Sequence, residues 1–182
     1  MRAGIHLADR SLLYRLRTRP GSPWHCAAAS LSRLAEYHRL LLIECGLLCL
    51  ADGAAGRRAA RLGAVSVLLT TSIVDVVLKP AVPRERPKPV LRRGVLSVLD
   101  AWPSGHTANA VAFSTTAGLV RPRRRTLLYG AAAAIGWSRV ALGAHYPSDV
   151  VGGAAVGGLV AYAVWLASPP PSSRYLIRGA VN

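Results

Sequence analysis

The sequence predicts an all-α protein: a polytopic transmembrane helical bundle of about five to six spans, with an amphipathic helix at its N-terminus. Three observations predict this class. Apolar residues make up 52% of the 182 positions and form long runs rich in Ala, Val, Leu and Gly. The mean hydropathy is positive, at +0.31. Arginines stand in short clusters between the apolar runs, which is the charge pattern of loops that flank membrane spans.

The net charge of +15 favours an anionic partner. Nucleic acid is one such partner, but the cations flank apolar runs instead of forming one basic face, so we exclude a nucleic-acid-binding role. An anionic substrate or an anionic membrane surface fits the distribution better. Three cysteines, Cys26, Cys45 and Cys49, form no CxxC pair and have no histidine at metal-ligand spacing, so we expect neither a metal site nor a cofactor.

Residues 1–20 are too polar to span a membrane, and they predict a basic helix that lies on the bilayer surface. Four apolar side chains can share one face of this helix: Ile5, Leu12, Leu13 and Leu16. The helix should end where Pro20, Gly21 and Pro23 follow one another.

The first span is expected within residues 24–51, with its apolar centre at 40–51 and a start near Ala27 or Leu34. Glu44 lies inside the apolar part, where an acid is costly, so it should face other helices or a polar cavity. A polar turn is expected at 52–61. The second span, 62–78, would be about 25 Å long, most of a bilayer's hydrocarbon thickness.

A long loop rich in proline and arginine is expected at 79–103, because its prolines forbid a regular helix. A loop of this length between spans is typical of a functional segment. Small residues in the last apolar run permit close helix contacts. The remaining spans are expected at 103–120, 126–142 and 147–167.

The basic hairpin RPRRR, residues 121–125, indicates which side of the bilayer each loop faces. If this hairpin is cytoplasmic, the loop 79–103 and the turn before the last span both face the opposite, outer side. The same alternation places the basic N-terminus outside, against its charge. Either the N-terminal helix rests on the outer surface, or the number of spans differs from this count.

Three polar stretches lie at the expected span ends: KPAVPRERP at 79–87, PSGH at 103–106 and WSRVALGAHYPSD at 137–149. Three of their cations, Lys79, Arg86 and Arg139, suit the oxygens of a phosphate group. Ser104 and Gly105 form a turn before a helix, where backbone N–H groups and the helix dipole favour an anion.

Two histidines complete the candidate site. Asp149 follows His145 by four residues, so in the first turn of a helix starting at Pro147 it can accept a hydrogen bond from one ring nitrogen. The other nitrogen of His145 is then a candidate nucleophile, and His106 a candidate general acid. Asp75 precedes Lys79 by one helical turn and is expected to pair with it. Each motif alone fits an ordinary turn or helix cap, whereas their gathering at one membrane face favours a phosphate site.

The three stretches match K-x6-RP, PSGH and SR-x5-H-x3-D without departure. This pattern resembles the three-part signature of the type 2 phosphatidic acid phosphatase superfamily, the lipid phosphate phosphatases. The motifs cover residues 79–149, and the span layout extends the resemblance to 31–167. Members usually have six spans, so the N-terminal helix stands in for the first. The chain then divides into a basic amphipathic segment, a transmembrane phosphatase domain and a flexible tail, at 1–23, 24–167 and 168–182.

The resemblance implies a metal-independent hydrolase in the inner membrane, with its active site on the extracytoplasmic face. It implies His145 as nucleophile, Asp149 as its partner and His106 as acid. It implies five phosphate ligands: Lys79, Arg86, Ser104, Gly105 and Arg139. The expected substrate is a lipid phosphate or diphosphate, such as undecaprenyl diphosphate of the cell-wall carrier cycle or phosphatidic acid. The alternatives are a vanadium-haloperoxidase-like oxidase and a non-enzymatic protein that binds lipid phosphates. Oligomeric state is not predicted.

Overall fold

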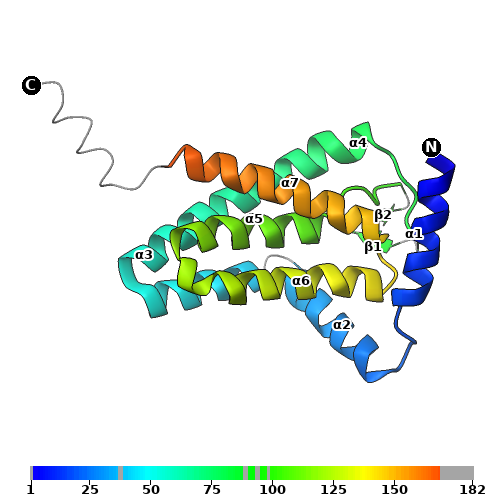
Figure 1. Cartoon of the computed structure of the whole chain (residues 1–182), viewed down its shortest axis with the longest axis horizontal. Helices are drawn as coiled ribbons and strands as arrows, with labels where there is room; N and C mark the ends of the chain where they lie inside the picture. The colour runs from blue at the N-terminus through cyan, green and yellow to red at the C-terminus, as the bar shows by residue number, and fades with distance from the viewer. Residues whose placement is uncertain (1, 37–38, 88–89, 93–94, 98, 169–182) are drawn as a thin grey trace, which may run out of the picture.

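The computed structural model describes residues 2–36, 39–87, 90–92, 95–97 and 99–168. It is a helical bundle in which α5, α6 and α7 run side by side and α3 closes one end (Figure 1). The helices are α1 (Arg2–Leu16), α2 (Pro23–Ala35), α3 (Arg39–Ser72), α4 (Lys79–Ala81), α5 (Gly105–Val120), α6 (Arg125–Ala141) and α7 (Pro147–Leu166). A π-helical turn, η2 (Ile73–Leu78), continues α3, and a 3-10 turn, η3 (Pro122–Arg124), precedes α6.

Helix α3 corrects the expectation for the first two spans. The segment 24–51 is not one helix, because α2 ends at Ala35 and α3 begins at Arg39. The expected polar turn at 52–61 is helical except at Gly53, whose φ of 55° and ψ of −129° break the helix there. This left-handed conformation suits glycine, so a single residue reverses the chain where the sequence predicted a ten-residue turn.

Helices α5 and α7 approach closely because α7 carries glycine at the contact. A Cβ added at Gly157 would lie 2.1 Å from the Ala108 carbonyl oxygen, and one at Gly153 would lie 2.5 Å from that of Ser104. No side chain fits at these distances. This contact holds the start of α7 against the PSGH turn, and so brings two of the three motifs together.

The segment between η2 and α5 contains a small sheet that the sequence did not predict. Strand β1 (Val90–Arg92) pairs antiparallel with β2 (Val95–Ser97), with Leu91 opposite Leu96. The bundle is helical, as the predicted all-α class requires, and these two short strands lie within the segment that was expected to be a long loop. Arg84 also pairs with Asp100 in an isolated parallel bridge. Its hydrogen bonds, Arg84 N–H to the Leu99 carbonyl and Ala101 N–H to the Arg84 carbonyl, tie the two ends of this segment together.

Helix α1 crosses the end of the bundle where the strands and α4 lie (Figure 1). It packs there through Leu13, which forms a small apolar cluster with Val140 and Tyr146. A larger apolar cluster, which contains Val67, Phe113 and Leu128, lies toward the opposite end. The N-terminal helix therefore belongs to the end that carries the three motifs.

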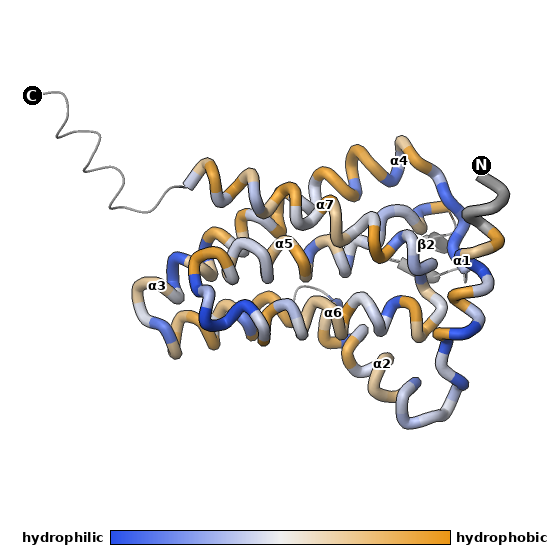
Figure 2. Tube along the Cα trace, in the orientation of Figure 1, coloured by the Kyte–Doolittle hydropathy of each residue, from blue (hydrophilic) through white to orange (hydrophobic). Residues whose placement is uncertain are grey.

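Among the described residues, two helical segments are long and apolar enough to cross a membrane: Arg39–Ala81, counted through η2 and α4, and Pro147–Leu166. Their apolar stretches appear as orange segments of the tube in Figure 2. Several of their large side chains are exposed, including Leu42, Leu50, Leu68, Val76, Val151 and Leu159. Helices α5 and α6, with 16 and 17 residues, lie where spans were expected. The count of five to six spans stays a prediction, and the expected tail lies outside the described residues from 169 onward.

Candidate active site

The three motifs converge on one cavity of about 350 Å³ at the end of the bundle that α1 covers. Six of the eight predicted site residues line it: Lys79, Arg86, Gly105, His106, Arg139 and His145. The other two, Ser104 and Asp149, are fully buried behind it. The cavity size is at the small end of the range for ligand sites. Residues separated by up to 66 positions in the sequence thus form one polar pocket.

His145 lies in the turn between α6 and α7 and is 2% exposed. Its Nδ1 is 2.8 Å from the Ala101 carbonyl oxygen. A carbonyl only accepts hydrogen bonds, so the proton is assigned to Nδ1 and the lone pair to Nε2. Arg86 Nη1 lies 3.2 Å from Nε2 and donates to it. The unprotonated ring nitrogen therefore faces a guanidinium inside the cavity.

Burial lowers the pKa of His145 well below its ordinary value, and the nearby Arg86 and Arg139 guanidinium groups lower it further. The hydrogen bond to Ala101 opposes this shift without cancelling it. The imidazole is therefore neutral at physiological pH. A neutral imidazole is the state that a nucleophile requires.

Asp149 does not make the hydrogen bond to His145 that its spacing predicted. Its Oδ2 lies 3.6 Å from His145 Nδ1, and it accepts a hydrogen bond from the Tyr146 backbone N–H at 2.8 Å. This bond caps α7, and the Ala101 carbonyl fixes the tautomer instead. The Asp149 carboxylate remains near enough to stabilise positive charge on the imidazole.

Arg84 and Asp9 form a second layer behind Asp149. Arg84 Nη1 lies 2.6 Å from Asp149 Oδ1, and its Nη2 lies 2.6 Å from Asp9 Oδ2. Asp9 also accepts the Ser148 backbone N–H at 3.1 Å and the Ser148 hydroxyl. The guanidinium stacks over the Tyr146 ring. Helix α1 is thereby joined through Asp9 to the first turn of α7.

Two carboxylates hold the cations of the loop before α5. Lys79 Nζ lies 2.6 Å from Asp75 Oδ1, which confirms the expected pair, and 3.9 Å from Asp100 Oδ2. Arg86 Nε donates to Asp100 Oδ1 at 2.6 Å. Both cations are buried, whereas Asp75 and Asp100 are partly exposed. The cationic groups therefore point inward from carboxylates that are closer to the surface.

Arg139 reaches the cavity from the last turn of α6. Its Nη1 donates to the Ser32 hydroxyl of α2, and its side chain is buried. Trp24 of α2 and Trp137 of α6 meet edge to face at 6.4 Å between ring centroids, which fixes the two helices against each other. Helix α2 thus orients the third cation.

The PSGH turn differs in one respect from the expectation. The Ser104 backbone N–H donates to the Asp149 carbonyl oxygen at 2.9 Å, so it is occupied, and the hydroxyl pairs with Thr107 at 3.0 Å. Ser104 therefore links α5 to α7 in this structure. Helix α5 begins at Gly105, where the first backbone N–H groups lack helical partners and favour an anion. His106 lines the cavity from the same turn.

Sequence reasoning missed Asp9, Ser32, Arg84 and Asp100. Arg84 had a signal, because it stands two residues before a predicted phosphate ligand in a loop dense with prolines. Asp100 precedes the PSGH motif closely, which is a weaker signal. Asp9 and Ser32 had none, because they belong to an amphipathic helix and to an apolar helix that reach the site only through packing.

Metal ligands do not gather in the described part of the chain: no group of three or more His, Cys, Asp or Glu side chains is placed to hold an ion. The three cysteines are unpaired. The charge available to a bound anion therefore comes from Lys79, Arg86 and Arg139.

A buried imidazole, a second histidine and three inward-facing cations thus share one pocket of a helical bundle. Comparison with known families agrees. The chain belongs to the PAP2 superfamily, whose profile matches residues 60–171. This confirms the resemblance to type 2 phosphatidic acid phosphatases.

Two curated relatives are lipid A 1-phosphatases. The one from Rhizobium etli is 38% identical over 101 residues, 51% of this chain and 44% of the relative. The one from Rhizobium johnstonii is 37% identical over 89 residues, 44% of this chain and 36% of the relative. The chain thus spans less than half the length of the curated relatives it matches.

Two solved structures share the fold. The transmembrane PAP2-type phosphatidylglycerolphosphate phosphatase from Bacillus subtilis has a TM-score of 0.63 and 22% identity, covering 88% of this chain and 84% of that one. Aquifex aeolicus LpxE has a TM-score of 0.66 and 20% identity, covering 85% and 92%. These two likenesses show the fold that the chain shares with both proteins.

Proposed function

We propose that the protein is a metal-independent lipid phosphate phosphatase that works through a phosphohistidine at His145. One observation carries the proposal: His145 directs its unprotonated Nε2 at Arg86 inside the cationic cavity. A phosphate bound among Lys79, Arg86 and Arg139 would place its phosphorus in reach of that nitrogen. Such positioning and charge stabilisation supply most of the catalysis in phosphoryl transfer.

The reaction would proceed in two displacements. Nε2 attacks phosphorus and forms an N–P bond, while the bond from phosphorus to the leaving oxygen breaks and His106 gives that oxygen a proton. The imidazole then carries positive charge, which Asp149 at 3.6 Å stabilises. His106 next removes a proton from water, which attacks phosphorus and breaks the N–P bond. Inorganic phosphate leaves and His145 is neutral again.

The substrate class is a lipid phosphate, since the apolar helix faces would contact its hydrocarbon part. The curated relatives support a lipid A phosphate among the candidates, and the Bacillus subtilis structure supports a phosphatidylglycerol phosphate. Undecaprenyl diphosphate and phosphatidic acid stay in the set. Membrane lipids are the only partners proposed.

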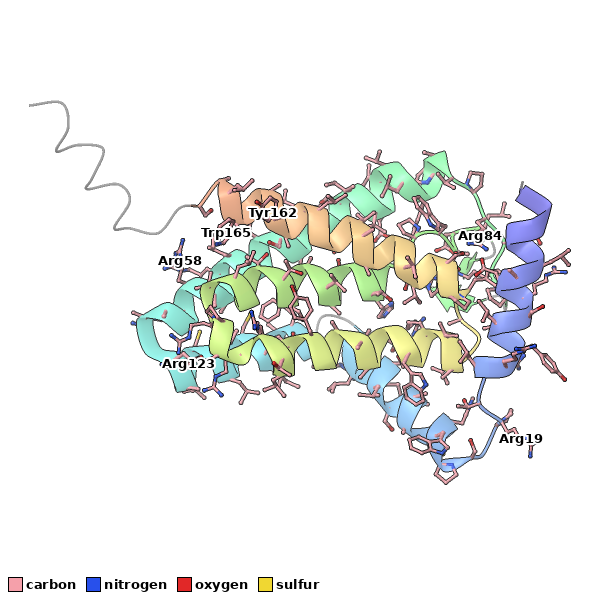
Figure 3. All side chains as sticks on the ribbon, in the orientation of Figure 1. Arg19, Arg58, Arg84, Arg123, Tyr162 and Trp165 are labelled. Atoms are coloured by element: carbon pink, nitrogen blue, oxygen red, sulfur yellow. The ribbon has the colours of Figure 1, made fainter. Side chains whose placement is uncertain are left out.

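The cavity is proposed to open at the extracytoplasmic face of the inner membrane. The RPRRR hairpin lies at the end of the bundle opposite the cavity, as the labelled Arg123 in Figure 3 indicates. Placing that hairpin in the cytoplasm puts the cavity outside. It also puts the basic helix α1 outside, which favours the arrangement in which α1 rests on the outer surface.

The test is phosphate release by detergent-purified protein, with chelator present, from lipid A, phosphatidylglycerol phosphate, phosphatidic acid and undecaprenyl diphosphate. Wild type and His145→Ala would be compared, and the phosphoenzyme trapped with labelled substrate. Chelator-resistant release and an acid-labile phosphoenzyme, both lost in the variant, are expected. Release that persists in His145→Ala would refute the nucleophile. Halide oxidation with added vanadate would favour the haloperoxidase alternative.

A further inference from the structure

The cavity is layered along α5. His106, Asn109, Ala110 and Phe113 recur at helical spacing on the face of α5 that lines it. At 1.5 Å per residue, His106 and Phe113 are about 10 Å apart along the helix axis. His106 lies at the end with the cations, and Phe113 lies in the apolar cluster with Val67. The side chains between these two ends have no role in the mechanism proposed above.

Three polar side chains from three helical segments line the cavity beyond its cations. They are Glu44 before the Gly53 reversal of α3, Thr71 after it, and Asn109 on α5. Helix α3 packs along α5, which brings both of its arms to this wall (Figure 1). The wall of the cavity therefore carries a carboxyl group, a hydroxyl and an amide away from its cations.

Thr71 and Asn109 orient each other. Asn109 Nδ2 donates to Thr71 Oγ1 at 2.9 Å, and the Thr71 hydroxyl lies 3.2 Å from Asn109 Oδ1. An amide has two N–H donors and two acceptor lone pairs, so one of each remains. The pair is fixed in place and retains hydrogen-bonding capacity toward the cavity.

Glu44 has no hydrogen bond or ion pair with any other residue of the described chain. It lies in the apolar part of a candidate span, where an ionisable residue is costly to keep and usually marks a functional site. The lining cations, Lys79, Arg86 and Arg139, are placed around the reacting phosphate instead. Glu44 therefore offers acceptor oxygens to whatever enters the cavity.

The direction of the reaction decides what meets Glu44. His106 gives its proton to the leaving oxygen, and Asn109 follows on the same face of α5, one turn further from the phosphate end. The group released from phosphorus would therefore lie against Glu44, Thr71 and Asn109. In a diphosphate that group begins with a second phosphate, whose oxygens accept hydrogen bonds and donate none to acceptor oxygens. In a glycosyl phosphate it begins with a sugar, whose hydroxyl and amide groups donate hydrogen bonds.

We propose that Glu44, Thr71 and Asn109 form a head-group subsite that selects a lipid with phosphate on a sugar over lipid diphosphates and over phosphatidic acid. The subsite accepts hydrogen bonds from hydroxyl or amide groups beside the phosphate. This inference depends on the proposed phosphatase function. It identifies a substrate class within that function, and it identifies Glu44 as the residue that determines the preference for this class.

The test compares kcat/KM for three lipids: lipid A with its sugar phosphate, dioleoyl phosphatidic acid and undecaprenyl diphosphate. The variants are Glu44→Gln, which keeps an acceptor oxygen without the charge, and Glu44→Leu, which removes both. Leu42→Ala is the matched control, because this neighbour on α3 is 69% exposed. Elution as a single species and an unchanged melting temperature would show that each variant folds.

Wild type should prefer lipid A over both other lipids by about tenfold or more, as expected for a site built to accept substrate hydrogen bonds. Glu44→Leu should lower both preferences by about tenfold. Glu44→Gln should keep the preference over phosphatidic acid and lose much of the preference over the diphosphate, because the amide N–H groups can donate hydrogen bonds to a second phosphate. Leu42→Ala should match wild type.

Two results would overturn the inference: a wild type that prefers the diphosphate, or a Glu44→Leu variant whose three rates fall by the same factor. Failure of the phosphatase function gives a different result, because no lipid would then be hydrolysed by wild type, or hydrolysis would survive His145→Ala.

Discussion

The two ends of the bundle are both rich in arginine, but in the described part of the chain they differ in how far the arginines are buried. In Figure 3, Arg84 lies at the end near α1 and the strands, whereas Arg58 and Arg123 lie at the other. At the first end the guanidinium groups of Arg84, Arg86 and Arg139 are buried or nearly so. At the second end Arg121 and Arg124 share the single carboxylate of Asp52, and Arg123 is exposed.

The difference teaches that burial and direction, more than the number of charges, distinguish a site from a surface. The arginines of the RPRRR hairpin remain in contact with solvent and serve topology through their charge. Those at the cavity are held by carboxylates, a hydroxyl and a backbone carbonyl, so their remaining donors are fixed in direction. Preorganised donors of this kind stabilise developing charge without reorganisation.

Replacement of His145 tests the comparison most severely. His145→Ala should lower kcat by at least about a thousandfold on every hydrolysed lipid, since the N–P bond can no longer form. Steady-state phosphate release and phosphoenzyme trapping measure this. A loss below about tenfold would mean that the nucleophile is elsewhere.

Matched arginines at the two ends give the next largest contrast. Arg86→Ala should lower kcat/KM by about 10²–10³-fold, because a donor aimed at the phosphate is lost. Arg123→Ala, at the other end, should stay within about twofold of wild type. Equal losses in both variants would show that net charge alone drives activity, and the comparison of the two ends would fail.

At the end of the bundle that carries the cavity, the sequence predicted which residues gather better than it predicted the contacts between them. His106, Arg86 and Arg139 were found because local spacing reflects chemistry along the chain. The ion pair of Arg84 with Asp9 joins positions 75 residues apart, and Ser148 contacts Asp9 across 139. Such contacts depend on how α1 packs on the bundle, which no local pattern encodes. The reversal at Gly53 lies within the turn predicted at 52–61, but its extent was not predicted, because Gly53 alone departs from helical backbone angles there.

Asp9 tests whether the N-terminal helix is part of this organised end. Asp9→Asn should lower kcat by about tenfold with little change in KM, because it weakens the ion pair with Arg84 that supports Asp149. Arg10→Ala is the control on the same helix, since Arg10 is exposed. Steady-state kinetics on one lipid measure both. If the two variants behave alike, α1 serves only as a membrane-surface helix.

The pH dependence of Asp9 has a definite sign. Burial raises its pKa, but hydrogen bonds from Ser148 and Arg84 outweigh this and lower it below the ordinary value. A lowered carboxyl pKa stabilises the fold above the unfolded-state pKa of about 3.9, and this contribution is lost as pH falls through the folded-state value. The melting temperatures of wild type and Asp9→Asn should therefore converge as pH falls below about 4.

His145 gives a second pH test that separates the two ends. Its pKa is lowered by burial first and by Arg86 and Arg139 next, so Arg86→Gln should raise it and Arg123→Gln should not. Titration of histidine Cε1 signals by NMR measures this directly. Near pH 6.5 only the unfolded chain takes up a proton at this imidazole. The free energy of unfolding therefore falls as pH drops below that value. If the titration midpoint of His145 is the same in Arg86→Gln as in wild type, the contact between Arg86 and His145 is contradicted.

The smallest effect is expected at the hairpin end. Asp52 is largely buried, it accepts hydrogen bonds from Arg121 and Arg124, and it precedes the Gly53 reversal of α3. Asp52→Asn should lower the melting temperature slightly and leave kcat/KM within about twofold of wild type, since the variant weakens an ion pair far from the cavity. Thermal unfolding and phosphate release on the same preparation measure both. A tenfold loss of kcat without loss of stability would mean that this end also shapes the cavity, because α3 carries Glu44 and Thr71 on its two arms. The two ends would then be coupled through α3, and the distinction between a structural end and a catalytic end would no longer hold.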